Sequence, residues 1–108
     1  MANILLIDGD GMLATELADN LGPWHHNLTT CSSAPVAIAE LTARNFNYDL
    51  IALNMSRNRP EDWKSLDQMR EFVQLTDAVP RIVCFSTAYW GPQMQLTIER
   101  RGCRLVYL

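Results

Sequence analysis

The chain has 108 residues, of which 48% are hydrophobic, so we expect a single globular domain with a buried core. Its net charge is −3 and the acidic and basic residues are interspersed, which argues against binding nucleic acid through the phosphate backbone. No apolar run reaches the length of a membrane span and the N-terminus has no basic leader, so we expect a cytoplasmic protein that does not contact a membrane.

Short apolar segments alternate with helical patterns along the first half of the chain. Residues 3–7 form an apolar run that ends before an acid, which predicts a buried strand. The leucines of the next segment recur at a spacing of four, as on one face of a helix: Leu13, Leu17 and Leu21. Residues 27–31 predict a second strand. Ser33 and Pro35 predict the start of a second helix that ends near Asn45. The buried stripe of that helix is expected at Ala34, Ala37, Ile38 and Leu41.

The second half of the chain continues the alternation. Residues 48–53 and 81–85 predict the third and fourth strands, and Pro60 lies near the start of the helix between them. A fourth helix precedes Gly102, and residues 103–108 predict a fifth strand. The apolar residues expected on these two helices are Leu66, Met69, Val73, Met94 and Ile98.

The expected order of elements is therefore βαβαβαβαβ. Short apolar strands separated by helices indicate a parallel sheet that helices cover on both faces. Right-handed crossovers then favour an α/β, flavodoxin-like, doubly wound fold with five strands in the order 2-1-3-4-5. We expect residues 1–108 to form this one domain.

In a sheet of this topology, ligand sites lie beyond the carboxyl ends of the strands, where the strand order reverses. In our assignment, two acids, an amide, two hydroxyl groups and a glycine follow three strands at this edge. They are Asp8, Gly9, Asp10, Asn54, Ser86 and Thr87. These residues form the candidate functional site.

Four segments, taken in order, resemble the receiver domain of response regulators, the CheY-like family. They are Asn-Ile-Leu-Leu-Ile-Asp-Gly-Asp at 3–10, Tyr-Asp-Leu-Ile-Ala-Leu-Asn-Met-Ser at 48–56, Val-Pro-Arg-Ile-Val-Cys-Phe-Ser-Thr-Ala at 79–88 and Arg-Arg-Gly-Cys-Arg-Leu-Val-Tyr-Leu at 100–108. The resemblance implies signal transduction in a two-component system. It also implies Mg²⁺ held by carboxylates, a phosphorylated Asp at the third strand and a Lys after the fifth.

The sequence departs from this family at the positions that carry phosphotransfer. Gly9 stands where the resemblance implies a metal-holding Asp, and Asn54 stands where it implies the phosphorylated Asp. The position of the Lys falls beyond Leu108, and Lys64, on the third helix, does not replace it. No Ser/His/Asp or Cys/His set falls at the strand ends either. We therefore expect a pseudo-receiver that is not an enzyme and uses no metal or other cofactor.

Two other interpretations of the same residues remain open. Asp8 and Asp10 can cap the first helix, where acids suit the positive end of the helix dipole, and Asn54 can hydrogen-bond its own loop. Alternatively, the cleft around Asp8, Asn54 and Ser86 acts as a sensor that binds an anion or a small ligand. A glycine-rich phosphate loop is lacking for this second alternative.

Receivers end with a helix that covers part of one sheet face, and this sequence has no residues for it. We expect the second to fourth helices to be divided between the faces, so that strands 3, 4 and 5 are uncovered on the side of the first helix. Three candidates could cover these strands: a second copy of the chain, which would make a homodimer, another protein, or a downstream segment. The residues expected at this interaction face are Trp90, Arg100, Arg101, Arg104, Val106, Tyr107 and Leu108. A lid is the alternative, formed by Trp24, Trp90, Arg100 and Arg104.

The chain has three cysteines, Cys31, Cys84 and Cys103, none in a Cys-x-x-Cys pair. Each lies in an apolar or strand-like segment. We expect buried, reduced thiols, as in a protein from a reducing compartment.

Overall fold

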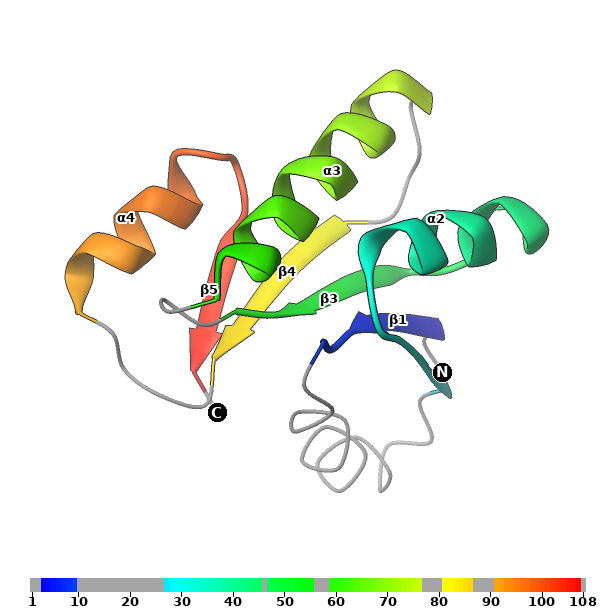
Figure 1. The fold of residues 1–108 in the computed structure, drawn as a ribbon, viewed down its shortest axis with the longest axis horizontal. Helices are drawn as coiled ribbons and strands as arrows, with labels where there is room; N and C mark the ends of the chain where they lie inside the picture. The colour runs from blue at the N-terminus through cyan, green and yellow to red at the C-terminus, as the bar shows by residue number, and fades with distance from the viewer. Residues whose placement is uncertain are drawn as a thin grey trace.

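The computed structural model describes residues 3–9, 27–45, 47–55, 59–76, 81–86 and 91–107. Five parallel strands form one sheet in the order β2-β1-β3-β4-β5, which confirms the predicted topology (Figure 1). The strands are β1 (Asn3–Ile7), β2 (Asn27–Cys31), β3 (Leu50–Asn54), β4 (Arg81–Ser86) and β5 (Arg104–Tyr107). The described helices are α2 (Ala34–Ala43), α3 (Pro60–Thr76) and α4 (Pro92–Glu99). The helix predicted over 11–21 lies outside the described residues.

Local sequence accounts for where these helices begin and end. Ser33 is the extended N-cap residue of α2, with a proline in the first turn, as expected. Asn45 has a φ of 52°, the left-handed conformation that stops the helix after Arg44. Gly102 has a φ of 75° and lies where the chain turns from α4 into β5. A residue with a side chain would be strained in this conformation.

The third strand begins two residues later than predicted. Tyr48 turns toward α2 instead, where its hydroxyl donates a hydrogen bond to Glu40 Oε1 at 2.8 Å. Asp49 connects to the start of β1, because its N–H donates to the Asn3 carbonyl at 2.8 Å and its Oδ2 accepts from the Asn3 N–H at 2.8 Å. These contacts position the chain just before β3, and pairing with the neighbouring strand begins only at Leu50.

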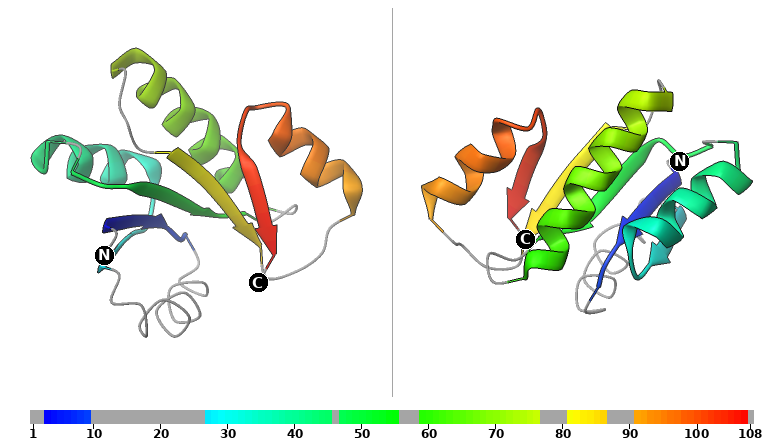
Figure 2. Two further views of the ribbon diagram at one scale, coloured as in Figure 1. Left: turned by 180° about the vertical axis from the view of Figure 1, so that it is seen from behind. Right: turned by 45° about the horizontal axis from the view of Figure 1, so that its top comes forward.

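All three described helices pack on one face of the sheet, which we call the helical face (Figures 1 and 2). The main core joins that face to the helices, and its largest members are Leu5, Ile51, Leu53, Leu41, Leu66, Met69 and Ile98. The prediction that these helices divide between the two faces is therefore wrong. The steps from β2 to β3, β3 to β4 and β4 to β5 run in the same direction across the sheet, and right-handed crossovers in one direction place their helices on one side.

The opposite face, which we call the far face, has a smaller core of Ile4, Leu6 and Ala52. Ala52 of β3 is fully buried there, so the prediction of an uncovered third strand is wrong. Over β4 and β5, the far-face side chains are half-exposed or exposed: Val83, Phe85, Val106, Arg81 and Arg104. On the far face, β4 and β5 therefore carry no buried side chain among the described residues.

All three cysteines are free, as predicted; Cys31 and Cys84 are buried, and Cys103 is half-buried. Burial raises the pKa of the Cys84 thiol to about 12, and the neighbouring Cys103 adds to this shift. Burial also raises the pKa of Cys103, although the nearby Arg70 and Arg101 oppose the change. None of the described helices combines the length and the hydropathy needed to cross a membrane.

Replacing a fully buried residue of α3 is expected to destabilise the domain far more than the same change at an exposed position. Leu66 has 0% exposure and Leu75 has 78%. We expect Leu66→Ala to lower the free energy of unfolding by about 2–5 kcal/mol, because it leaves a cavity under the helix. The control Leu75→Ala is expected to change it by less than about 0.5 kcal/mol. Urea unfolding followed by circular dichroism measures both values, and equal losses would contradict the packing of α3.

The cysteines are expected to react with thiol reagents in an order set by burial. The thiolate is the nucleophile, and because burial raises the pKa of Cys84 to about 12, very little of this thiol is ionised at pH 8. Native protein treated with iodoacetamide should be modified at Cys103 first, and at Cys84 only after urea unfolds it. Peptide mass spectrometry locates the label, and equal rates at both residues in native protein would contradict the burial of Cys84.

Candidate functional site

The predicted site lies where the carboxyl ends of three neighbouring strands meet. Asp8 follows β1, Asn54 ends β3 and Ser86 ends β4. Asp8 is 3% exposed and Ser86 is 1% exposed, so the carboxylate and the hydroxyl are buried in the domain. Asp10 and Thr87 lie outside the described residues.

A side-chain hydrogen bond joins β3 to β1 at this edge. The Asn54 side-chain Nδ2 donates to Asp8 Oδ1 at 2.8 Å, and the Asp8 N–H donates to the Cys31 carbonyl at 2.9 Å, which extends the ladder between β1 and β2. A carboxylate as buried as Asp8 needs hydrogen-bond donors, and the amide of Asn54 supplies one. Asn54 therefore connects β3 to β1 rather than only ordering its own loop.

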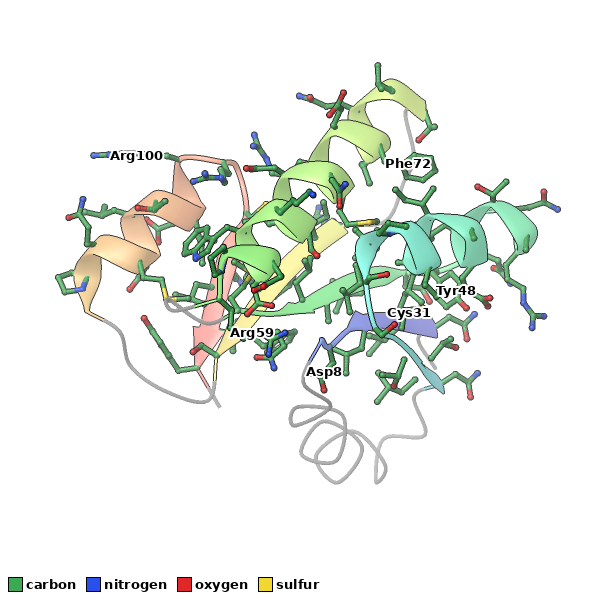
Figure 3. The ribbon with its side chains drawn as sticks, viewed as in Figure 1. Asp8, Cys31, Tyr48, Arg59, Phe72 and Arg100 are labelled. Carbon is green, nitrogen blue, oxygen red and sulfur yellow. The ribbon has the colours of Figure 1, made fainter. Side chains whose placement is uncertain are left out.

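Arg59 belongs to the same site, although the sequence analysis did not identify it. It immediately precedes α3, and a β-carbon at Gly9 would lie 2.8 Å from Arg59 Nη2. The absence of a side chain at Gly9 is what gives the guanidinium its place beside β1 (Figure 3). The contact joins residues 50 positions apart, and no local pattern in the sequence marks it.

The Arg59 side chain is also held by an acid in the first turn of α3. Its Nε lies 3.4 Å from Asp62 Oδ1, an ion pair whose geometry falls short of a hydrogen bond, since that buried Nε has no hydrogen-bond partner. Asp62 itself is only 7% exposed. The guanidinium thus brings a fixed positive charge to the edge that carries the buried carboxylate of Asp8.

The residues that the structure describes at this edge do not fit a Mg²⁺ ion of the kind that the resemblance implies. Mg²⁺ prefers two or more hard oxygen ligands in octahedral geometry. Gly9 offers no ligand, and the Asn54 amide nitrogen faces Asp8. The guanidinium of Arg59, always protonated, lies beside the position where a second carboxylate would stand and would repel a divalent cation.

A small cleft opens beside these residues. Its volume is about 200 Å³, and it is lined by one arginine, two acids, other polar residues and two apolar residues: Arg59, Glu61, Asp62, Gly9, Ser32, Ser33, Asn54, Ser65, Ile7 and Leu53. Sites for drug-sized ligands span about 300–1,000 Å³. The cleft therefore has room only for a guest of about the size of an ion.

The residues predicted for the interaction face separate into different environments. Arg100 is exposed at the end of α4 (Figure 3), whereas Arg101 binds within the chain. Arg101 Nε donates to Asp67 Oδ1 at 2.9 Å, and its guanidinium lies 5.4 Å from the ring centroid of Trp63. Arg104 and Val106 share the far face, and Tyr107 is 37% exposed at the end of β5. Trp90 and Leu108, like Trp24 of the predicted lid, lie outside the described residues.

No protein-family model and no curated protein matches the sequence. Solved structures do match the fold. A chain of the CheX–CheY complex with beryllofluoride and Mg²⁺ from Borrelia burgdorferi superposes with a TM-score of 0.76 at 16% identity, over 99% of this chain and 78% of that one. The receiver domain of an Arabidopsis thaliana histidine kinase gives 0.75 at 13% identity, over 98% and 79%.

A receiver domain of a Francisella response regulator is similar as well, with a TM-score of 0.72 at 13% identity, over 99% of this chain and 84% of that one. Identities this low carry information about the fold alone. The order of the strands agrees with the fold of these structures. The chain therefore has the fold of response regulator receiver domains.

Proposed function

We propose that this protein is a receiver-like signalling module that acts through protein contacts, does not use aspartyl phosphorylation and is not an enzyme. The observation that carries the proposal is the pair of substitutions at the strand ends. An amide, Asn54, donates its hydrogen bond to Asp8 where a nucleophilic carboxylate would be needed, and Arg59 lies against Gly9 where a metal-holding acid would be needed.

The charges at the carboxyl ends of the strands favour a single conformation of the site over a phosphorylation-dependent switch. The amide of Asn54 is a poor nucleophile and carries no charge at any physiological pH. The positive charge of Arg59 is covalently part of the chain, so it stays near Asp8 whatever the concentration of Mg²⁺. Both features support a module whose conformation is independent of phosphate transfer.

Two of the similar solved structures, and one surface of this chain, support a role in protein contacts. One similar structure is a CheX–CheY complex, and another is the P1 domain of CheA3 bound to CheY6 from R. sphaeroides, so proteins of this fold bind other proteins. In this chain β5 pairs only with β4 among the described strands, and Val83, Phe85 and Val106 are half-exposed on the far face. An edge strand with an apolar face is a surface that proteins usually cover. A second copy of the chain is the partner that we propose for it.

The first test is a backbone amide NMR titration with Mg²⁺ and beryllofluoride, which mimics an aspartyl phosphate. We expect the backbone amide chemical shifts of Asp8, Asn54 and Ser86 to stay unchanged. Residue 54 has no carboxylate to accept the mimic, and Arg59 repels the metal. Shifts at these residues that spread to α4 and β5 would overturn the proposal.

A restored variant is the positive control for this titration. Gly9→Asp, Asn54→Asp and Arg59→Ala together supply the two missing carboxylates and remove the guanidinium. We expect this triple variant to show Mg²⁺-dependent shifts around residue 8, which would establish that the assay detects an occupied site.

The second test addresses self-association through the far face. We expect the mass measured by sedimentation equilibrium to rise from one copy to two over a wide dilution series. Val106→Glu places a charge on the half-exposed patch and should weaken the dimer by about tenfold or more. The matched control is Val36→Glu on α2, where the valine is 48% exposed, and it should leave the dimer unchanged. A monomer at every concentration would contradict a second copy as the partner.

A further inference from the structure

A polar cavity lies at the amino edge of the sheet, at the other end of β1 from the candidate site. Its volume is about 310 Å³, and it lies between the starts of β1 and β2, the second half of α2 and the segment before β3. Figure 3 shows Tyr48, which lines this cavity, beside α2 and at the end of β1 opposite to Asp8. The cavity is therefore separate from the candidate site.

The strand residues of this cavity share one face of the sheet. Asn3 lies two positions before Leu5 in β1, and Asn27 and Thr29 lie four and two positions before Cys31 in β2. Leu5 and Cys31 belong to the main core under the helices, so the three polar side chains lie on the helical face, where α2 also packs. The first two meet directly, because Asn27 Nδ2 donates to Asn3 Oδ1 at 3.0 Å.

A hydrogen-bond network fixes the opposite wall of the cavity. The Tyr48 hydroxyl donates to Glu40 Oε1 at 2.8 Å, and Arg44 Nε lies 3.3 Å from the same oxygen. Burial raises the pKa of the Tyr48 phenol, and a side-chain hydrogen bond from Thr29 opposes that change. The network thus connects β2, α2 and the segment before β3, which holds its polar groups in place before any ligand binds.

The charges and the polarity of the lining restrict what can bind. Among the described residues that line the cavity, only Glu40 and Arg44 are charged, and they pair with each other. The cavity therefore has no excess of charge that would attract an anion or a cation. Every lining side chain carries a polar group, so an apolar ligand would deprive these groups of water without replacing its hydrogen bonds.

Several of these polar groups still have unused hydrogen-bonding capacity. In the part of the chain that the structure describes, both bonds to Glu40 end on Oε1, and the side-chain amide of Asn47 bonds to no other residue. Asn3 accepts through Oδ1, which leaves its amide nitrogen as a donor. Carboxylate oxygens accept, whereas amides both donate and accept. A hydroxyl group can do both as well, so a ligand with several hydroxyl groups matches this mixture.

We propose that this cavity binds a neutral polyhydroxylated molecule of the size of one sugar ring. Its volume is at the lower end of the range of about 300–1,000 Å³ that small-molecule sites span, so one ring fits better than an oligosaccharide. The fixed network would orient the ligand hydroxyls. The inference goes beyond the proposed function, because it uses neither the strand-end residues nor self-association.

A backbone amide NMR titration of the full chain tests the proposal with D-glucose, D-galactose and myo-inositol. Each probe is added to about 100 mM, a hundredfold above a Kd of about 1 mM. We expect saturable shifts at Asn3, Thr29, Asn47 and Tyr48 with at least one probe, and none at Asp8. Glucose and galactose differ in the orientation of one hydroxyl group, so a fixed site should bind them with different affinities. No saturable shift with any probe, or equal affinity for all three, would overturn the site.

A charged probe tests whether the ligand is neutral. D-glucose 6-phosphate should bind no more tightly than the best of the three neutral probes, because the cavity has no excess of positive charge. Raising the salt concentration should leave the affinity of the neutral probes unchanged. Tighter binding of the phosphate ester that is lost at high salt would show an anion site and would overturn the proposal.

Matched variants locate the binding. Asn47→Ala removes an exposed amide and Tyr48→Phe removes only a hydroxyl group, and each should weaken the best probe about two- to tenfold, the range of one hydrogen bond. Gln93→Ala removes an exposed amide from α4, outside the cavity, and should leave the affinity unchanged. Equal losses in all three variants, or no loss in the two cavity variants, would overturn the location.

Folding of the variants is checked by urea unfolding. Tyr48 packs against the main core, so its variant is compared with the unmodified chain before its affinity is interpreted. Asn47 is exposed, so Asn47→Ala should keep the free energy of unfolding within about 0.5 kcal/mol. The affinity of Asn47→Ala therefore decides the location even where Tyr48→Phe destabilises the domain.

Discussion

Right-handed crossovers that all step in one direction, from β2 through β3 and β4 to β5, determine most of what this molecule presents to its surroundings. They place the described helices on one face and leave β4 and β5 half-exposed on the other. They also bring the carboxyl ends of the strands to one edge and the amino ends to the opposite edge. The position of the buried Asp8 is a consequence of that single constraint.

The two edges differ in how their charges are balanced. At the carboxyl edge, the buried Asp8 receives a hydrogen bond from Asn54 and has Arg59 nearby, while Asp62 pairs with that arginine. Near the amino edge, one carboxylate, Asp67, pairs with two arginines, Arg70 and Arg101. A buried charge with local partners needs no further ligand. In the proposed function, the carboxyl edge is therefore structural.

The strand order and most element boundaries could be predicted from the sequence, because apolar runs and helical spacing are local signals. The candidate site could be predicted only in part. Asp8, Asn54 and Ser86 follow predicted strands, but Arg59 reaches Gly9 across 50 positions and no local pattern marks that contact. The same limit applies to Arg101, which the sequence groups with Arg100 and Arg104, while the structure pairs it with Asp67, 34 positions away. The predicted division of the helices between two faces is wrong for another reason. The face on which a crossover helix lies depends on the direction of the step across the sheet as well as on the right-handedness of the crossover.

The close approach of Arg59 to Gly9 also constrains how this sequence can evolve. A mutation that introduced an acid at position 9 would place its carboxylate beside the guanidinium, and the two would pair with each other. The new acid would thus be neutralised before it could contribute to a metal site, and selection for metal binding would not retain it. An acid at position 9 could therefore contribute to a metal site only in a chain that had already lost the arginine at position 59, so the order of the two mutations matters.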